Sequence, residues 1–376
     1  MSEKVKNHFV PKFYLKQFVN SDLISLYHIG QDAYIPDIPA EDQAQKKRLY
    51  GDNSELEDAF GELETEVAPI LKNIIKKNKI PPKSSMNYFS LMNFTILQNQ
   101  RTFKAIYQTD KGIEQMLKKY LEDIPDFKDI DLDKYEIRTK NAFALATGSA
   151  IPIAIESIDL EPVLIVNNTK YPFIVSDNPC IKYNLFAEHI RWHNDGRGFG
   201  TTGLQIFLPL NERLLIAFFD KKVYKTNTKG KKKTILNATK EDVINLNKLQ
   251  FVCADECLYY KNRKNIKEVI SQIKEAEGLR KDFIPSTQKL HGQDGYLLIH
   301  SEAQLKAMLQ LSFFQIKKEY KNFSREGLSL GGLKRESFND FYIKTFDMAL
   351  RELDPKKVTM KLFEILTEKQ KKYGNQ

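Results

Sequence analysis

The aromatic run at residues 8–18 constrains the fold most, because it places apolar side chains where a chain usually begins as a mobile end. Pro11 suits the first turn of a helix, since its φ is fixed and it has no backbone N–H to pair. In that helix Tyr14 and Phe18 lie on one face. A strand is predicted directly afterwards, at residues 23–27. A short apolar helix that feeds a strand must pack against a larger body.

Length and composition limit the classes of protein to which this chain can belong. A chain of 376 residues suits one large domain with an extension, or two domains. The three cysteines make no disulfide framework, the polar start lacks an apolar signal region, and no apolar run approaches membrane-spanning length. These features predict a soluble cytoplasmic protein with no membrane partner.

The net charge of +9 permits an anionic partner, either nucleic acid or a nucleotide. Lysine outnumbers arginine, however, and lysine gives diffuse phosphate attraction where arginine gives bidentate recognition. The basic runs, such as residues 72–83 and 221–233, are therefore interpreted first as solvated surface.

Helical spacing dominates the first half of the chain. A helix is predicted from a Ser54–Glu57 capping box to about residue 74, with Pro69 expected to kink or divide it. A long buried helix is predicted over about residues 88–103, more helix follows to about residue 121, and another helical stretch spans residues 134–150. Residues 28–52 have no clear period and predict an irregular connection.

The middle of the chain changes to strand patterns. Residues 163–166 and 171–175 predict a hairpin, and residues 203–210 and 214–219 predict a second strand pair. Residues 241–259 predict a helix that runs into a strand. After residue 285 two helices are predicted, at 301–320 and from Asp354-Pro355 onward.

These patterns predict an α+β fold in which a helical N-terminal half packs on a mostly antiparallel sheet. The predicted domain covers residues 1–285, and residues 286–376 form a helical extension that is a candidate for protein binding or self-association.

The opening motif resembles that of a known family. His8, Val10, Pro11, Tyr14, Leu15 and Phe18 match the His-x-Val-Pro-x-x-Tyr-Leu-x-x-Phe opening of the family catalogued as domain of unknown function 4238. A Gln-x-x-Arg element at Gln98 and Arg101 and a Ser-Asp-Asn-Pro element at residues 176–179 match the family in order. The resemblance covers roughly residues 5–260 and implies no activity.

Two helix positions carry the first candidate site residues. Glu57 and Glu64 lie two helical turns apart at the margin of an apolar face, where carboxylates can hold a hard metal ion or act as acid and base. Glutamate is also simply a good helix former. Gln98 and Arg101 share a face of an apolar helix. Arg101 either clamps an anionic ligand or makes a structural ion pair with Glu57 or Glu64.

A second set lies where a predicted strand ends, at Ser176, Asp177 and Asn178. Polar groups at a strand end are well placed for a site, but Asp and Asn also build turns by bonding to their own backbone. His8 has the same two interpretations: a catalytic imidazole or a hydrogen-bonded turn residue. The pairs His189/His193 and Cys253/Cys257 lack the further ligands that a zinc site needs.

Three hypotheses follow if these residues share one pocket. In the first, the protein is a metal-dependent phosphodiester hydrolase acting on nucleic acid or a nucleotide. The catalytic residues are then His8, Asp177 and Arg101: Glu57, Glu64 and Asp177 hold Mg²⁺ or Mn²⁺, His8 acts as general base or acid, and Arg101 stabilises phosphate charge. Tyr14, Gln98, Ser176 and Asn178 complete its binding surface. In the second, Arg101 and the asparagines bind a small anion without catalysis, as in a sensor or interaction module. In the third, the polar set is a buried structural network.

Overall fold

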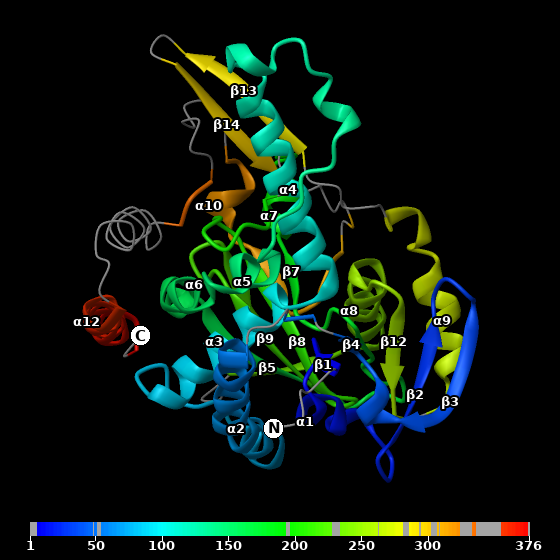
Figure 1. Cartoon of the computed structure of the whole chain (residues 1–376). Helices are drawn as coiled ribbons and strands as arrows, with labels where there is room; N and C mark the ends of the chain where they lie inside the picture. Colours follow the sequence, from blue (N-terminus) through cyan, green and yellow to red (C-terminus); the bar gives the residue numbers. More distant parts are fainter. Residues whose placement is uncertain are drawn as a thin grey trace.

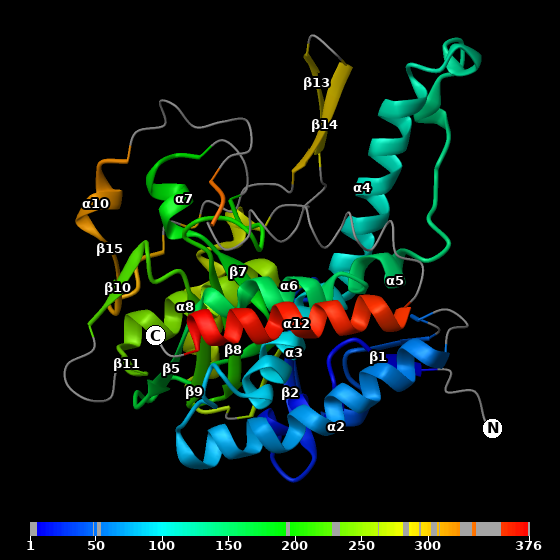
Figure 2. The same cartoon turned by 90° about the vertical axis from the view of Figure 1, so that its left-hand side faces the viewer.

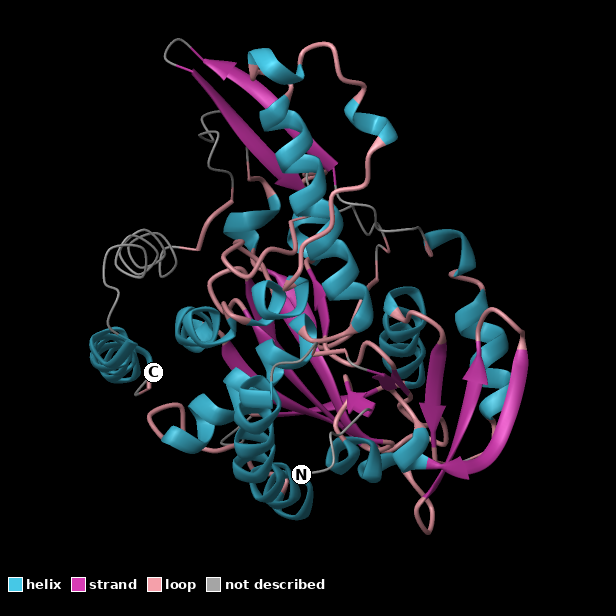
Figure 3. Cartoon of the chain, in the orientation of Figure 1, coloured by secondary structure: helices cyan, strands magenta, loops and turns pink. Residues whose placement is uncertain are grey.

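Figure 1 presents the computed structural model of the chain, which describes residues 6–47, 49–50, 54–192, 196–227, 234–261, 263–280, 286–292, 295–301, 307, 309–323, 333–335 and 355–374. Helices and strands are mixed along the chain, and the first long stretch after residue 54 is helical (Figure 3). The α-helices are α1 (Lys12–Leu15), α2 (Ser54–Lys77), α3 (Met86–Gln100), α4 (Phe103–Leu121), α5 (Ala142–Thr147), α6 (Ala150–Glu156), α7 (Leu185–His189), α8 (Lys240–Cys253), α9 (Ile266–Lys274), α10 (Lys318–Lys321) and α12 (Pro355–Tyr373).

A five-stranded sheet lies at the centre, with strand order β11-β5-β9-β8-β7. Every neighbouring pair in it is antiparallel except β11 with β5. A second, four-stranded sheet has the order β3-β2-β12-β6 and is antiparallel throughout. The strands of these two sheets are β2 (Leu23–His28), β3 (Ala33–Pro39), β5 (Glu161–Asn167), β6 (Val175–Ser176), β7 (Ile181–Tyr183), β8 (Gln205–Asn211), β9 (Leu214–Phe219), β11 (Ile235–Ala238) and β12 (Cys257–Tyr260).

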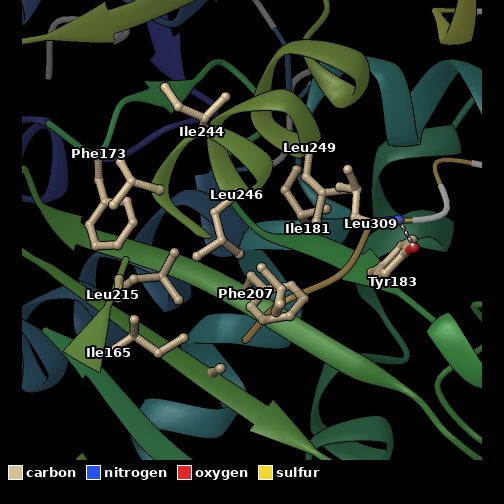
Figure 4. Close-up of a cluster of buried hydrophobic side chains, with 14 of the residues drawn as sticks. Ile165, Phe173, Ile181, Tyr183, Phe207, Leu215, Ile244, Leu246, Leu249 and Leu309 are labelled. Atoms are coloured by element: carbon tan, nitrogen blue, oxygen red, sulfur yellow. Dashed lines mark hydrogen bonds between the residues drawn. The ribbon is translucent and has the colours of Figure 1, made fainter. Parts of the chain in front are cut away.

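Both faces of the central sheet are buried under helices. Alternate residues of each strand point to opposite faces, so each strand contributes to a first core on one face and a second core on the other. On one face Ile165, Phe207 and Leu215 pack against Leu246 and its neighbours on α8 (Figure 4). On the other face the intervening strand residues join a second core with α2, α3 and α6. There the ring of Tyr88 on α3 lies 6.3 Å from that of Phe218 on β9. The protein is therefore a helix–sheet–helix arrangement around this sheet.

The aromatic opening docks as the sequence predicts. Tyr14, Leu15 and Phe18 are fully buried in the second core, and Pro11 precedes α1. The Tyr14 hydroxyl donates a hydrogen bond to the carbonyl of Pro209 on β8, so α1 is fixed to the central sheet. A short strand before it, β1 (Lys6–His8), pairs antiparallel with β4 (Gln45–Lys47).

Several sequence predictions are confirmed. The strand at 23–27 is β2, the second strand pair is β8 with β9, and the helix running into a strand is α8 followed by β12. The α+β class, the helical N-terminal half, the mostly antiparallel sheets and a helix at the C-terminus are also observed. The side chain of Ser54 and the whole of Asp354 lie outside what the structure describes, so the caps expected there stay predictions.

The predicted first hairpin is wrong. β5 pairs with β9 and β11, while residues 175–176 form β6 in the other sheet. Two asparagine side chains form hydrogen bonds with the backbone groups that would otherwise have paired in the hairpin. The Asn167 amide donates to the Tyr171 carbonyl at 2.6 Å, and Asn247 bonds both the Ile174 N–H and the Pro172 carbonyl. The chain therefore leaves the central sheet after β5.

Other helix and loop predictions also need correction. Residues 28–52 contain β3 and β4; β3 carries two prolines, which an edge strand tolerates because one side of it forms no ladder. Pro69 does not divide α2. The helix expected from residue 88 and the further helix to 121 are observed as α3 and α4, and their boundary lies at Thr102, whose side chain caps the N-terminus of α4. The helix expected at 134–150 is observed only in part: α5 covers its second half, and a separate helix, α6, begins near its expected end and continues to Glu156.

The described part of the C-terminal region contains strands that the sequence analysis did not predict. A hairpin of β13 (Ser286–Gly292) and β14 (Gly295–Ser301) packs along α4 and projects with it from the body (Figure 1). The helix predicted at 301–320 is wrong: β15 (Phe314–Ile316) pairs with β10 (Tyr224–Thr226) because Phe313, Phe314 and Ile316 are buried in the first core. The Leu309 N–H donates to the Tyr183 hydroxyl at 2.9 Å (Figure 4). Helix α12 lies against α6 (Figure 2).

One segment, Ala142–Asp159, is long and apolar enough by composition to cross a membrane, contrary to the expectation from sequence. Half of it is buried inside the protein, and it is divided into α5, α6 and a 3₁₀ turn at Ser157–Asp159. The core helices of soluble proteins pass the same test, so this segment is weak evidence for a membrane span.

Candidate functional site

Arg101 is the centre of a buried polar cluster at the end of α3. Its side chain is 1% exposed, and Nη2 lies 2.8 Å from Glu64 Oε1. Nη2 also donates to the carbonyl of His8, and Nε to that of Phe9, each at 3.1 Å. One turn earlier, Gln98 donates to the same Phe9 carbonyl at 2.8 Å. The two residues of the Gln-x-x-Arg element therefore hold the opening segment in place.

His8 and Glu57 complete this group, which we call the Arg101 cluster (His8, Glu57, Glu64, Gln98 and Arg101). His8 Nε2 lies 2.8 Å from the Glu41 carbonyl, and burial lowers the pKa of the imidazole. Glu57 accepts a hydrogen bond from the Asn7 amide at 3.3 Å. His8, Glu57 and Glu64 line a cleft of about 870 Å³ whose other charged residues have both signs: Lys6, Lys12, Lys47, Glu41 and Asp42.

Three predicted binding residues are fully buried. Tyr14 is fixed to Pro209, and Gln98 to Phe9, as described above. Ser176 lies 2.8 Å from the Gln250 side-chain oxygen on α8. Each side chain forms a bond that joins distant segments of the chain. Their observed role is to position the backbone in the interior.

Asp177 closes the turn between α8 and β12. Its carboxylate accepts the N–H groups of Asp255 at 2.8 Å, Glu256 at 2.6 Å and Cys257 at 2.8 Å. Burial raises the pKa of Asp177 to about 6, although the three N–H donors act in the opposite direction. A carboxylate with three backbone donors is well explained as a structural acceptor.

The structure divides the predicted site residues into two groups, so their expected convergence on one pocket is wrong. His8, Glu57, Glu64, Gln98 and Arg101 gather beside the opening strand, whereas Ser176, Asp177 and Asn178 bond to α8 and the turn after it. Glu57, Glu64 and Asp177 therefore do not form one Mg²⁺ or Mn²⁺ site. Among the described residues, no three His, Cys, Asp or Glu side chains are grouped to bind a metal ion.

A different cleft, of about 400 Å³, lies beside the start of α4, and we call it the cationic pocket. Its described lining includes three cationic side chains and no Asp, Glu or His. The cations are Lys104 on α4, Lys182 on β7 and Arg197 in the segment after α7. Four amides, Asn99, Gln100, Gln108 and Asn178, and three hydroxyls, Thr102, Thr109 and Ser149, supply further polar groups.

The three cations occupy different environments. Lys104 lies 3.4 Å from the Cys253 carbonyl, and burial lowers the pKa of its ammonium group, although nearby Asp255 and Asp177 act in the opposite direction. The Lys182 ammonium lies 4.6 Å from the ring centre of Phe199. Arg197 is 6% exposed. Desolvation makes the charge on Lys104 costly, and an anion in the pocket would offset that cost.

The two family elements meet at this pocket. Asn99 next to Gln98 donates to the Cys180 carbonyl at 2.8 Å, and Asn178 of the Ser-Asp-Asn-Pro element donates to the Cys253 carbonyl at 3.2 Å. The first turn of α4 also lines the pocket, so the positive end of that helix dipole lies at its wall. Burial raises the pKa of the Cys180 thiol to about 12, which disfavours the thiolate form.

Of the pocket's residues, the sequence had predicted only Asn178. Lys104, Lys182 and Arg197 each lie in an ordinary stretch of sequence, and only the fold brings them to one wall. The one available signal was that the polar residues Asn99, Gln100 and Thr102 interrupt an otherwise apolar helix pattern.

Comparison with family models places residues 6–264 in the family described as "Protein of unknown function (DUF4238)". No curated protein and no solved structure matches the chain.

Proposed function

The chain belongs to this DUF4238 family, whose description assigns no activity, and we propose from the geometry that it binds a small phosphate-bearing ligand in the cationic pocket. One observation carries the proposal: three cations and no carboxylate among the described residues that line a cleft of about 400 Å³. Lysine and arginine together with a helix N-terminus are the groups that bind phosphate.

The apolar part of the lining narrows the class of ligand. Ile113 and Met116 on α4, Leu145 on α5 and Phe199 line the same cleft as the cations. A ligand that uses the whole pocket therefore carries both an anionic group and a flat or apolar group. A nucleotide has both, and the net charge of +9 favours such an anion.

Binding without turnover is the better supported form of this proposal. Hydrolysis with a metal ion needs carboxylates that can take a ligand position. Glu64 already pairs with Arg101, and Asp177 accepts three backbone N–H groups. The cysteine pKa described above also argues against Cys180 as a nucleophile. The proposed role is that of a nucleotide sensor.

The test measures binding of ATP, AMP, adenosine and inorganic phosphate by calorimetry and thermal shift. ATP or AMP is expected to stabilise the protein, and adenosine to bind far more weakly. Lys182→Ala removes one charged contact and is expected to weaken nucleotide binding by roughly tenfold. Lys248→Ala is the matched control, since Lys248 is also half-buried but pairs with Glu275 outside the cationic pocket.

Three outcomes would overturn the proposal. They are no stabilisation by any of the four compounds, equal loss of binding in the control, and turnover of nucleotide or of single-stranded DNA or RNA with Mg²⁺ or Mn²⁺. The last outcome would favour the metal-dependent hydrolase instead.

A further inference from the structure

A short C-terminal segment, Leu333 to Arg335, lies against the loop that forms one wall of the cationic pocket. The Thr202 N–H donates to the Leu333 carbonyl at 2.9 Å, and the Arg335 N–H donates to the Gly200 carbonyl at 2.7 Å. Thr201 and Lys334 form an antiparallel bridge between these two bonds. The segment therefore pairs with residues 200–202 as a small piece of sheet.

The same segment is fixed on its other side by the Arg335 side chain. Arg335 is 4% exposed, and its Nε lies 3.0 Å from Asp159 Oδ2. Its Nη2 reaches the Glu156 carbonyl at 3.4 Å. Leu333 is buried in the first core. These contacts place Arg335 between the end of α6 and the 197–202 loop.

The two elements that Arg335 contacts, the 197–202 loop and the end of α6, each continue into a wall of the cationic pocket. Arg197 and Phe199, which line the pocket, directly precede Gly200 in the loop. On the other side, Ser149 and Leu145 line the pocket just before α6, whose end carries Glu156. A displacement of Arg335 would therefore alter the spacing of two walls without touching the ligand.

We propose that Arg335 is a positioning residue that couples docking of the C-terminal region to anion binding in the cationic pocket. This inference rests on the proposed function. Residues 333–335 lie beyond the family match at 6–264, so a segment outside the family domain holds the loop that forms one wall of the pocket. Coupling between two sites is reciprocal. Ligand binding therefore stabilises the docked segment, and the docked segment strengthens ligand binding.

The experiment uses the full chain and compares wild type with Arg335→Lys and Lys334→Ala. Lysine keeps the positive charge of Arg335 but lacks the planar fork that reaches Asp159 and Glu156 together. Lys334 lies in the same segment with an exposed side chain, so its truncation is the matched control. Hydrogen exchange is followed at the amides of Thr202 and Arg335, with and without ATP, and the Kd for ATP is measured by calorimetry.

We expect ATP to slow exchange at both amides in the wild type. Arg335→Lys is expected to speed exchange at Thr202 and to weaken ATP binding by about fivefold to tenfold. Lys334→Ala is expected to change neither measurement. Circular dichroism separates this result from unfolding, which would speed exchange throughout the chain.

The outcomes distinguish the inference from the function on which it rests. If the wild type binds ATP and Arg335→Lys binds it equally well, the coupling is refuted while the proposed function stands. If the wild type binds none of the four compounds, the proposed function and the coupling are both refuted. Faster exchange at Thr202 in Arg335→Lys would then report only that Arg335 holds the loop.

Discussion

Two polar regions lie on either side of the junction between α3 and α4, and they differ in the groups that surround their charged side chains. In the Arg101 cluster, the guanidinium meets Glu64 and two backbone carbonyls. In the cationic pocket, three cations line a cleft with no carboxylate among its described residues. In the first region, Nε and Nη2 of the guanidinium bond to groups of the protein. In the second, charged side chains from three parts of the chain line a cavity.

The contrast teaches that polarity within a family motif does not identify a ligand site. Gln98 and Arg101 of the motif point into the protein, whereas their neighbours Asn99 and Gln100 line the cationic pocket. Side chains one residue apart on a helix point about 100° away from each other, since there are 3.6 residues per turn. The same helix end therefore serves structure on one side and the proposed ligand on the other.

The largest effect should come from breaking the Arg101 cluster. Arg101→Met leaves the carboxylate of Glu64 and the His8 carbonyl without their guanidinium donor. Losing one partner of a largely buried ion pair is expected to lower the free energy of unfolding by about 3–5 kcal/mol. Urea denaturation of this variant measures the loss.

The control for this variant is Arg138→Ala, whose Arg138–Glu136 pair is exposed to solvent and is therefore expected to leave the free energy of unfolding almost unchanged. The folded fraction of Arg101→Met should bind ATP with a Kd close to that of the wild type. Loss of binding in that fraction, with stability little changed, would place Arg101 in the ligand site and remove the contrast between the two regions.

The next effect concerns Glu156, which pairs with Lys369 of α12 at 2.7 Å and is 1% exposed. Burial raises the pKa of Glu156 from its ordinary 4.5 to about 7. Between these values the unfolded chain has released the proton and the folded chain has kept it. Stability therefore falls as the pH rises from about 4.5 to 7, by about 3 kcal/mol from this group.

Glu156→Gln removes this proton uptake and tests it directly. Thermal melts from pH 4.5 to 8 should show the wild type losing stability relative to the variant as the pH rises. A difference between the two proteins that stays constant over this range would mean that Glu156 does not titrate there. The result would also show whether the contact with α12 depends on pH.

The sequence predicted those parts of the fold that are encoded locally. Strand pairing of β8 with β9 follows from a short turn between two apolar runs, and docking of Tyr14 and Phe18 follows from their helical spacing. The first hairpin could not be predicted, because Asn247, more than 70 residues away, bonds the backbone at 172–174. β15 was missed for the same reason, since its partner β10 is distant in sequence.

The candidate site could be predicted only in part. The sequence identified polar residues on helix faces and at strand ends, and four of them do gather with Arg101. Their spacing carries no information on whether a carboxylate is already paired, so Glu64 and Asp177 were equally good candidates for metal binding. The cationic pocket is lined by residues from 99 to 253. No local sequence pattern shows that residues so far apart along the chain lie close together in the fold.

A smaller effect is expected at Asp177, which belongs to neither region. Asp177→Asn retains one carbonyl oxygen and replaces the other with a donor that faces the N–H groups of Glu256 and Cys257. We expect a loss of about 2 kcal/mol in the free energy of unfolding. Nucleotide affinity should stay the same or rise slightly, because a negative charge near Lys104 is removed. A loss of metal-dependent activity in this variant would instead restore Asp177 as a catalytic residue.

The smallest effect is expected at His8, where the structural and catalytic interpretations differ most sharply. His8→Ala removes one partly exposed hydrogen bond to the Glu41 carbonyl, which is expected to contribute about 1 kcal/mol. Burial lowers the pKa of His8 below its ordinary 6.5, so the folded state favours the neutral ring. The stability that this titration contributes is present above pH 6.5 and is lost as the pH falls. This pH dependence has the opposite sign to that of Glu156. Chemical denaturation of wild type and His8→Ala at pH 5 and pH 8 should therefore give the smaller difference at pH 5.

A nuclease assay on the same two proteins with Mg²⁺ or Mn²⁺ completes this test. Cleavage by the wild type that disappears in His8→Ala would assign chemistry to the Arg101 cluster. Unchanged nucleotide binding in His8→Ala, with only the modest loss of stability, would keep the two regions distinct. The cluster would then be the part that holds the opening segment, and the cationic pocket the part that meets the ligand.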